Sequence, residues 1–205
     1  MPARFAFWPQ IRKDPASSRI IANWRALTGG KAIRDPQRKT LIACSGGADS
    51  AALAIALAAA SKHIILAHIL HDMRPALQAH ADRDATLGLA QKLNIPCLVT
   101  SVACRDKPGN AEANYRDARY QALSQLAFEN ACPFIATGHH RDDQIETMLM
   151  RLVRGAGFGT LAGIRASRPL SSTLAPSPPL TLIRPMLSVT HEDAQRLCLI
   201  ADYKW

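Results

Sequence analysis

The stretch Ser45-Gly46-Gly47-Ala48-Asp49-Ser50 decides the fold, because it joins an apolar run at 40–44 to an alanine-rich run at 51–60. This order predicts a strand, a glycine turn and a helix. Two glycines let the backbone turn tightly and approach a ligand closely. The helix that follows points its N–H groups and positive dipole end back at the turn, which favours an anion. The sequence therefore predicts a phosphate site with Ser45 and Ser50 as hydroxyl donors. The alternative is a plain turn between two elements.

Asp49 is the unusual member of this turn, because a carboxylate beside a phosphate repels it. A divalent cation between the two groups would remove the repulsion, and Mg²⁺ is usually held by one or two carboxylates together with phosphates. We therefore expect Mg²⁺ on Asp49. A Walker A loop is excluded, since no lysine follows the glycines at the spacing which that loop requires.

The composition indicates a basic, non-secreted protein. The 205 residues suit one α/β domain, or one domain with an appendage. No run of eighteen apolar residues and no signal-peptide pattern occurs, so we expect no membrane span and no secretion. The 5 cysteines are scattered singly, which argues against a disulfide framework and favours the cytoplasm. A net charge of +9 favours nucleic acid as a partner, the alternative being a merely soluble basic surface.

Apolar runs alternate with helical patterns along the chain. Residues 1–37 are interpreted as a basic extension with one helix at about 16–27 that packs on the domain, and residues 38–205 as the main domain. We expect an α/β fold, an open parallel sheet of about five strands with helices on both faces, Rossmann-like. Residues 155–163 and 167–179 are predicted to be loops. Six basic side chains are expected to face solvent or a polyanion, namely Arg19, Arg25, Lys31, Arg34, Arg38 and Lys39.

Two polar clusters follow predicted strands, at residues 68–75 and 138–147. The carboxyl ends of parallel strands meet at one sheet edge, so both clusters should lie near the glycine turn. In the second cluster His139, Asp143 and Glu146 share one helical face. The alternatives are a zinc site or solvated carboxylates that cap a helix.

Arginines are the other candidate ligand-binding side chains. Arg116 and Arg119 share a helical face with Glu112, where the alternative is an exposed ion pair. Arg119 could equally clamp a phosphate. Arg151 and Arg154 directly precede the glycine-rich segment and suit an anionic ligand.

Taken together, these motifs resemble the ATP-binding domain of the tRNA(Ile)-lysidine synthetase family, a branch of the PP-loop ATP pyrophosphatases. The turn matches the SGGxDS signature, and residues 68–75 (HILHDMRP) are similar to HVDHGLRP. Residues 112–120 (EANYRDARY) are similar to EaxaRxxRY, and residues 138–155 to AHHxDDqxETxLxRLxRG. Residues 183–187 resemble the RPLL segment. Leu70 stands where the family has Asp, and Asp72 where it has Gly.

The resemblance covers residues 38–202 and implies a function. Residues 38–205 would be the PP-loop catalytic domain, without the tRNA-binding domains with which the family continues. Its ligands would be ATP and Mg²⁺, and its partners free L-lysine and the tRNA(Ile) with a CAU anticodon. ATP would adenylate the wobble cytidine, and lysine would then displace AMP to form lysidine. The sequence leaves undecided whether the chain forms a homodimer.

The resemblance also assigns residues. The catalytic set would be Asp49, Arg119, His139 and Asp143. ATP would be bound by Ser45, Gly46, Gly47, Ala48, Asp49, Ser50 and His68. Lysine or tRNA would be bound by Glu146, Arg116, Arg151 and Arg154.

Three other classes compete with this interpretation. A PP-loop tRNA 2-thiolation enzyme would carry paired cysteines for an iron–sulfur cluster, and no such pair occurs. A small-molecule ligase of the NAD or GMP synthetase type shares the turn but explains neither the basic charge nor the motif at 138–155. An ATP-binding module without ligase activity would bind ATP and release no pyrophosphate.

Overall fold

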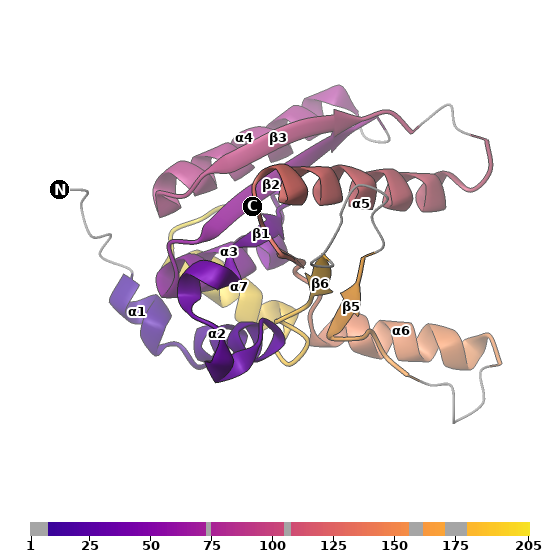
Figure 1. The fold of residues 1–205 in the computed structure, drawn as a ribbon. Coiled ribbons are helices and arrows are strands. Elements are labelled where there is room, and N and C mark those ends of the chain that lie inside the picture. Colours follow the sequence, from indigo (N-terminus) through magenta and orange to yellow (C-terminus); the bar gives the residue numbers. More distant parts are fainter. Residues whose placement is uncertain (1–7, 73–74, 105–107, 156–161, 171–179) are drawn as a thin grey trace.

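The fold is a six-stranded sheet in the order β3-β2-β1-β4-β6-β5 (Figure 1). The computed structural model describes residues 8–72, 75–104, 108–155, 162–170 and 180–205. Five strands run parallel, and β5 pairs with β6 in the antiparallel sense. The strands are β1 (Thr40–Ala43), β2 (Ile64–His71), β3 (Cys97–Val102), β4 (Phe134–Ala136), β5 (Ser167–Pro169) and β6 (Thr181–Ile183).

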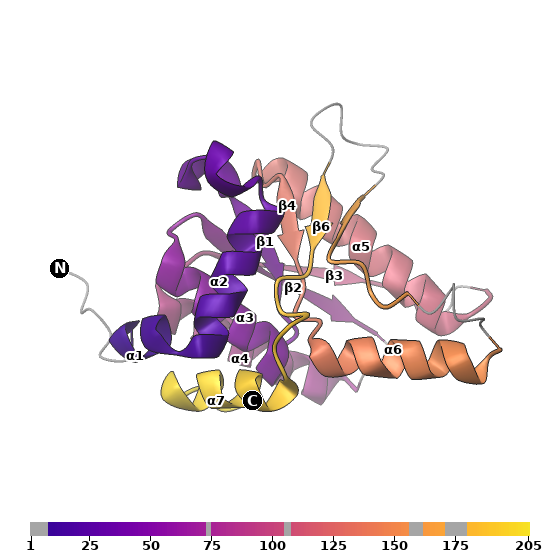
Figure 2. The same ribbon diagram turned by 90° about the horizontal axis from the view of Figure 1, so that it is seen from below.

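Helices cover both faces of this sheet, unequally. The α-helices are α1 (Trp8–Lys13), α2 (Pro15–Leu27), α3 (Ala48–Ala60), α4 (Ala76–Leu93), α5 (Ala111–Glu129), α6 (Arg141–Val153) and α7 (His191–Ile200), with short 3₁₀ helices η1 (Gly30–Ala32) and η2 (Asp35–Arg38). One buried cluster joins α1, α2, α3, α4 and α7 to the sheet, and a second joins α5 to the opposite face. Helix α6 extends away from the rest of the molecule (Figures 1 and 2).

The central strand shows why this packing follows from the sequence. Side chains alternate between the faces of a strand. Ile42 and Cys44 therefore belong to the cluster around α3, while Leu41 and Ala43 belong to the cluster under α5. Because both faces are covered, the strand is an unbroken apolar run, as buried parallel strands are.

The strand order fixes the place of a ligand site. From β1 the chain moves outward to β2 and β3, and then crosses back to place β4 on the other side of β1. In open α/β sheets ligands bind outside the carboxyl ends of the strands where the order reverses. Here that position lies after β1 and β4, between residues 44–47 and residues 137–140.

The predicted α/β class and the five parallel strands are confirmed. Segment 167–179, predicted to be a loop, begins instead with the antiparallel edge strand β5, whose three residues are too few to show a period. The predicted helix at 16–27 is α2, and its Ile20 and Trp24 are fully buried against α3. Most of the loop at 155–163 and all of 171–179 lie outside the described residues.

Arg38 corrects one expectation, because it does not face solvent. It is 4% exposed, and its guanidinium donates to the carbonyls of Arg25 and Ile33 at 2.9 and 2.6 Å and to Thr28 Oγ1 at 2.8 Å. The last carbonyls of a helix lack partners within it, so a nearby arginine satisfies them. Arg38 thus attaches the end of α2 to the start of β1.

Candidate active site

The phosphate turn, residues 44–50, is held together by one hydroxyl. Ser50 Oγ donates to the Gly47 carbonyl at 3.1 Å and accepts the Ser45 N–H at 3.1 Å. Ser50 is 7% exposed, whereas Ser45 is exposed. Ser45 Oγ lies 3.3 Å from Ser50 Oγ, and because Ser45 is exposed, its hydroxyl is the one of the two that a ligand can reach.

Two glycines permit close backbone contacts around the site: Gly46 lets the turn approach α4, and Gly138 lets the end of β4 approach the start of α3. Gly46 has φ +89°, and a Cβ there would lie 2.9 Å from the Asp82 carbonyl oxygen. A Cβ on Gly138 would lie 2.9 Å from the carbonyl carbon of Asp49. Both contacts are shorter than a side chain tolerates. This close packing brings Asp49 beside the residues that follow β4.

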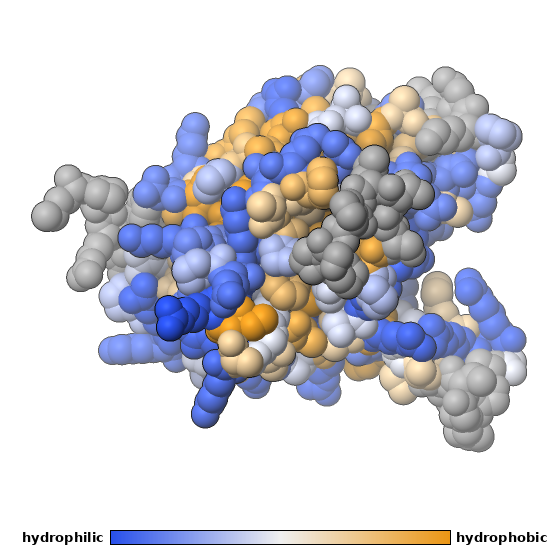
Figure 3. Space-filling view, viewed as in Figure 1, coloured by the Kyte–Doolittle hydropathy of each residue, from blue (hydrophilic) through white to orange (hydrophobic). Residues whose placement is uncertain are grey.

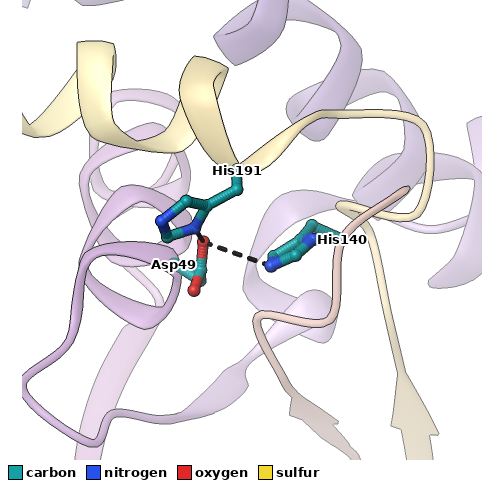
Figure 4. Close-up of side chains that lie close together, drawn as sticks. All are labelled: Asp49, His140 and His191. Atoms are coloured by element: carbon teal, nitrogen blue, oxygen red, sulfur yellow. Dashed lines mark hydrogen bonds and ion pairs between the residues drawn. The ribbon is translucent and has the colours of Figure 1, made fainter. Parts of the chain in front are cut away.

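The Asp49 carboxylate lies between two imidazoles (Figure 4). Its Oδ1 is 2.8 Å from His191 Nδ1 and 3.6 Å from His140 Nε2. Among the described residues, these three form the one group of His, Cys, Asp and Glu whose ligand atoms are close enough for a shared metal ion. Mg²⁺, however, prefers carboxylate oxygens to imidazole nitrogens as ligands. Asp49 therefore fits Mg²⁺ through its second oxygen.

Beside the turn lies a cavity of about 240 Å³. It is lined by Ala43, Ser45, Gly47, Asp49, Ser50, Arg119, Thr137, Gly138, His139 and Asp143. The cavity thus unites the turn with His139 and Asp143 from the second polar cluster, as the sheet-edge argument predicted, and adds Arg119 from α5.

His68 lies behind the turn and not on the wall of this cavity. It is 4% exposed, and its Nδ1–H donates to the Cys44 carbonyl at 3.0 Å. Burial lowers the pKa of His68, so the ring is neutral. His68 therefore supports the turn through the Cys44 carbonyl, and its effect on ATP would be indirect, through the position of the turn.

A larger hollow of about 840 Å³ opens between α5 and α6, and the space-filling view shows it as a notch (Figure 3). Arg119, His139 and Asp143 line both the cavity and the hollow, so the two spaces meet at these residues. The hollow is basic: its ionised wall comprises Arg116, Arg119, Arg151, Arg165, Arg168 and Arg184 against Glu112, Asp143 and Glu146. It suits an anionic substrate that also carries a cationic group.

Burial tunes two of these side chains. His139 donates or accepts at Thr137 Oγ1 over 2.9 Å, and burial with the nearby Arg184 charge lowers its pKa to about 4. His139 is therefore neutral at pH 7 and acts as a hydrogen-bonding group and not as a cation. Arg184 is only 6% exposed; burial lowers its pKa, although a guanidinium stays charged at pH 7.

The remaining predicted residues divide between the two spaces. Arg116, Glu146 and Arg151 line the hollow, as substrate-binding residues should. Arg154 does not; it lies with Ile145, Leu149 and Val153 on another side of α6. His139, Asp143 and Glu146 do not form a metal group in the described part of the chain, which disfavours the zinc alternative.

Asp72, which stands in the first polar cluster where the family has Gly, makes a structural contact. Asp72 Oδ1 and Oδ2 accept the Cys104 N–H at 2.9 and 3.1 Å. Asp72 thus ties the end of β2 to the segment after β3, and it does not line the cavity beside the turn.

Sequence reasoning missed several residues of the site. His140 stood beside His139 in the motif at 138–155, and Arg184 stood in the segment at 183–187, so a signal existed for both. His191, Arg165 and Arg168 offered none, because only the fold brings segments so distant in sequence to the carboxyl ends of β1 and β4.

Residues 18–205 match the family model described as "PP-loop domain". Proteins named tRNA(Ile)-lysidine synthase are similar in sequence. The one from Salinispora tropica is 40% identical over 166 residues, which are 77% of this chain and 46% of that protein. The one from Novosphingobium aromaticivorans is 36% identical over 189 residues, 91% of this chain and 53% of that protein. The chain spans about half the length of these relatives.

Solved structures with the same fold are more distant in sequence. U34-tRNA thiolase NcsA from Methanococcus maripaludis, described with its [4Fe-4S] cluster, superposes with a TM-score of 0.71 at 17% identity and covers 94% of this chain and 66% of that chain. NMN synthetase from Francisella tularensis gives a TM-score of 0.58 at 15% identity, covering 93% and 72%. At such identities the likeness shows the fold alone. No helix of the described residues is long and apolar enough to cross a membrane.

Proposed function

The chain belongs to the PP-loop domain family, and from this premise we propose that it ligates L-lysine to C2 of the wobble cytidine in the CAU-anticodon tRNA(Ile), at the expense of ATP. The observation that carries the proposal is the junction of two spaces at Arg119, His139 and Asp143. A phosphate cavity alone would suit any ATP-binding module. A basic hollow that opens into it supports a large anionic substrate whose reacting atom meets the ATP α-phosphate.

In the first step the cytidine O2 attacks the α-phosphate of ATP, the α–β phosphoanhydride bond breaks, and pyrophosphate leaves. Backbone N–H groups of the turn and the N-terminus of α3 would bind the phosphates. Arg119 faces both spaces and would bind the α-phosphate through two parallel hydrogen bonds. Mg²⁺, held by Asp49 and phosphate oxygens, would neutralise charge on the leaving pyrophosphate.

In the second step the ε-amine of lysine forms a bond to C2, and AMP leaves with the former O2. The amine must lose a proton before it attacks. Asp143 and Glu146 are the carboxylates that would bind the ammonium and take this proton, while neutral His139 would donate a hydrogen bond to the phosphate.

A thiolation activity is the second candidate, since NcsA shares the fold. All 5 cysteines are free thiols, and none takes part in a metal-binding group within the described chain. The cysteine arrangement therefore favours the ligase, which we assign to the reducing cytoplasm.

The decisive experiment supplies the chain with ATP, Mg²⁺, radiolabelled lysine and a CAU-anticodon tRNA(Ile) transcript, and follows lysine incorporation and pyrophosphate release together. We expect both signals, and neither with a transcript whose wobble cytidine is replaced by uridine. The matched control is Asp49→Asn, which should keep the fold and abolish pyrophosphate release. Pyrophosphate release without incorporation would limit the chain to the adenylation step, and the absence of both would leave an ATP-binding module.

A further inference from the structure

Helix α7 and the residues after it contact the phosphate turn at three points. His191 Nδ1 lies 2.8 Å from Asp49 Oδ1, Cys198 Sγ lies 3.3 Å from the Ala48 carbonyl, and Tyr203 Oη lies 2.7 Å from the Gly46 carbonyl. Figure 2 shows α7 beside α3. Burial raises the pKa of Cys198 to about 12 and also raises the pKa of Tyr203, so both remain protonated donors. Three side chains from one end of the chain thus fix three residues of the turn.

The contact at Asp49 determines which nitrogen of His191 carries the proton. An ionised carboxylate can only accept a hydrogen bond, so Nδ1 must be the donor. The other nitrogen, Nε2, faces the Gln195 amide nitrogen at 3.0 Å, which can donate to it. The two contacts agree in placing an N–H on Nδ1, toward Asp49.

His140 presents its other nitrogen to the same oxygen. Its Nδ1 accepts the backbone N–H of Asp142 at 3.2 Å. A backbone amide can only donate, so Nδ1 is the acceptor and the ring N–H lies on Nε2, which is 3.6 Å from Asp49 Oδ1. Both imidazoles therefore direct N–H groups, and not lone pairs, at Asp49.

This arrangement favours a clamped carboxylate over a metal ion bound between the two rings. A metal needs the nitrogen lone pairs that protons occupy here. In addition, α3, α6 and α7 all begin at these residues, and helix N-termini favour negative charge. The second Asp49 oxygen points away from both rings (Figure 4). Asp49 also lines the phosphate cavity, so this oxygen is the one that remains for ligands.

We propose that His191 is a positioning residue, whose Nδ1–H holds Asp49 Oδ1 and thereby presents Oδ2 to the phosphate cavity. Its catalytic consequence rests on the proposed function. Residues that orient a metal-binding carboxylate typically contribute 10- to 100-fold to affinity or activity. Helix α7 would then set the geometry of a turn about 140 residues away in sequence, through the 2.8 Å contact.

The first test reads the tautomer directly by ¹⁵N-histidine NMR, without any turnover. We expect His191 to carry its proton on Nδ1 in the unaltered chain and to change to the ordinary Nε2–H form in Asp49→Leu. Finding His191 as Nε2–H in the unaltered chain would overturn the proposal. Since this test uses no substrate, a chain that shows the expected tautomer but releases no pyrophosphate contradicts the proposed function and not the contact.

The second test uses two substitutions of one side chain. An asparagine amide nitrogen takes the place of Nδ1, so H191N keeps the donor, whereas H191L removes it. We expect H191L to lower the kcat of pyrophosphate release about 10- to 100-fold with KM for ATP within about twofold, and H191N to restore most of it. His80→Leu, on the exposed face of α4, is the control and should match the unaltered chain.

Two outcomes of the second test would contradict a positioning role. Equal damage in H191N and H191L would mean that the donor is not what matters. Stoichiometric Zn²⁺ binding to the unaltered chain that H191N abolishes would mean that the imidazole serves as a metal ligand, because an amide cannot replace it.

Discussion

The phosphate turn is fixed by hydrogen bonds from three directions, whereas α6, on the other side of the site, buries none of its 13 residues. The first turn of α6 is anchored: Asp143 Oδ2 accepts the His140 N–H at 2.8 Å, and Asp142 Oδ2 accepts the His191 N–H at 2.9 Å. Farther along, Leu149 is 56% and Val153 is 86% exposed. Near the far end, the exposed Arg151 guanidinium donates to the Ala162 carbonyl.

The difference separates two tasks within one site. Groups that stabilise developing charge act best when they are oriented before the reaction, since no reorganisation is then needed. The turn meets this requirement. The wall that would face the proposed tRNA substrate can instead be ordered on binding, and the remote turns of α6 have few contacts that would prevent this.

Truncating one leucine in α3, beside the phosphate turn, and one in α6 should give the largest difference in the free energy of unfolding. Leu53→Ala in α3 removes a fully buried side chain and should lower the free energy of unfolding by about 2–5 kcal/mol. Leu149→Ala in α6 should change it by no more than about 0.5 kcal/mol, because the side chain is 56% exposed. Urea unfolding of both variants measures this. A large loss in Leu149→Ala would show that α6 is covered in the folded protein.

The stability of the folded protein should also depend on pH, because the pKa of His139 in the site is lowered. The pKa of His139 is about 4 when folded, against about 6.5 in an unfolded chain. Between these values the unfolded state binds the extra proton, so stability is complete above pH 6.5 and falls as the pH drops toward 4. The shift corresponds to at most about 3 kcal/mol. Thermal unfolding across this range checks the prediction.

A substitution isolates the contribution of this ring. His139→Gln should flatten the pH dependence of stability, leaving the part that buried His68 supplies in the same direction. If the unaltered chain and this variant lose stability equally between pH 6.5 and 4, His139 is not the group responsible.

The sequence predicts the turn side of this comparison better than the α6 side. A phosphate turn is local: a strand, two glycines and a helix dictate it, and the carboxyl ends of parallel strands place His139 and Asp143 nearby. These predictions need only periodicity and sheet topology. Spacing along α5 groups Arg119 with Glu112 and Arg116, but only the family resemblance implies its place in the site.

What the sequence does not predict depends on long-range packing. His191 lies 142 positions from Asp49 and reaches it because α7 packs on α3. Arg38 lies in a basic segment and is expected to be exposed, yet it is buried, because its guanidinium donates to carbonyls at the end of α2. On α6, spacing alone puts Arg151 and Arg154 together, but the fold turns one toward the hollow and the other away from it.

Gly138→Ala tests whether the close packing around the phosphate turn depends on its glycines. The added Cβ would lie 2.9 Å from Asp49 carbonyl carbon, so the start of α3 must move, at a cost of about 1–3 kcal/mol in stability. Pyrophosphate release should fall as well, since Asp49 moves with the backbone. Gly88→Ala is the control, because nothing lies within 4 Å of its added Cβ and alanine favours a helix. Unchanged stability in Gly138→Ala would contradict the close packing.

The smallest expected effect concerns the basic wall of the hollow. Arg116 and Arg154 carry the same charge and are both exposed, but only Arg116 lines the hollow. If tRNA phosphates enter the hollow, Arg116→Ala should weaken tRNA binding about two- to fivefold, because an exposed charge pair contributes up to about 1 kcal/mol. It should also reduce the slope of log affinity against log salt by about 1.

Arg154→Ala provides the comparison on the same substrate. It removes the same charge from another side of α6, so it should leave both affinity and salt slope nearer those of the unaltered chain. Filter binding over a range of salt concentrations measures both quantities, and ATP binding to either variant should be unchanged. Equal losses in the two variants would mean that tRNA responds to the net charge of the molecule and not to the hollow. In that case tRNA would have no defined binding position in the hollow. Unequal losses would mean that tRNA binds on the side of α6 that faces the hollow, although α6 has few contacts with the rest of the fold.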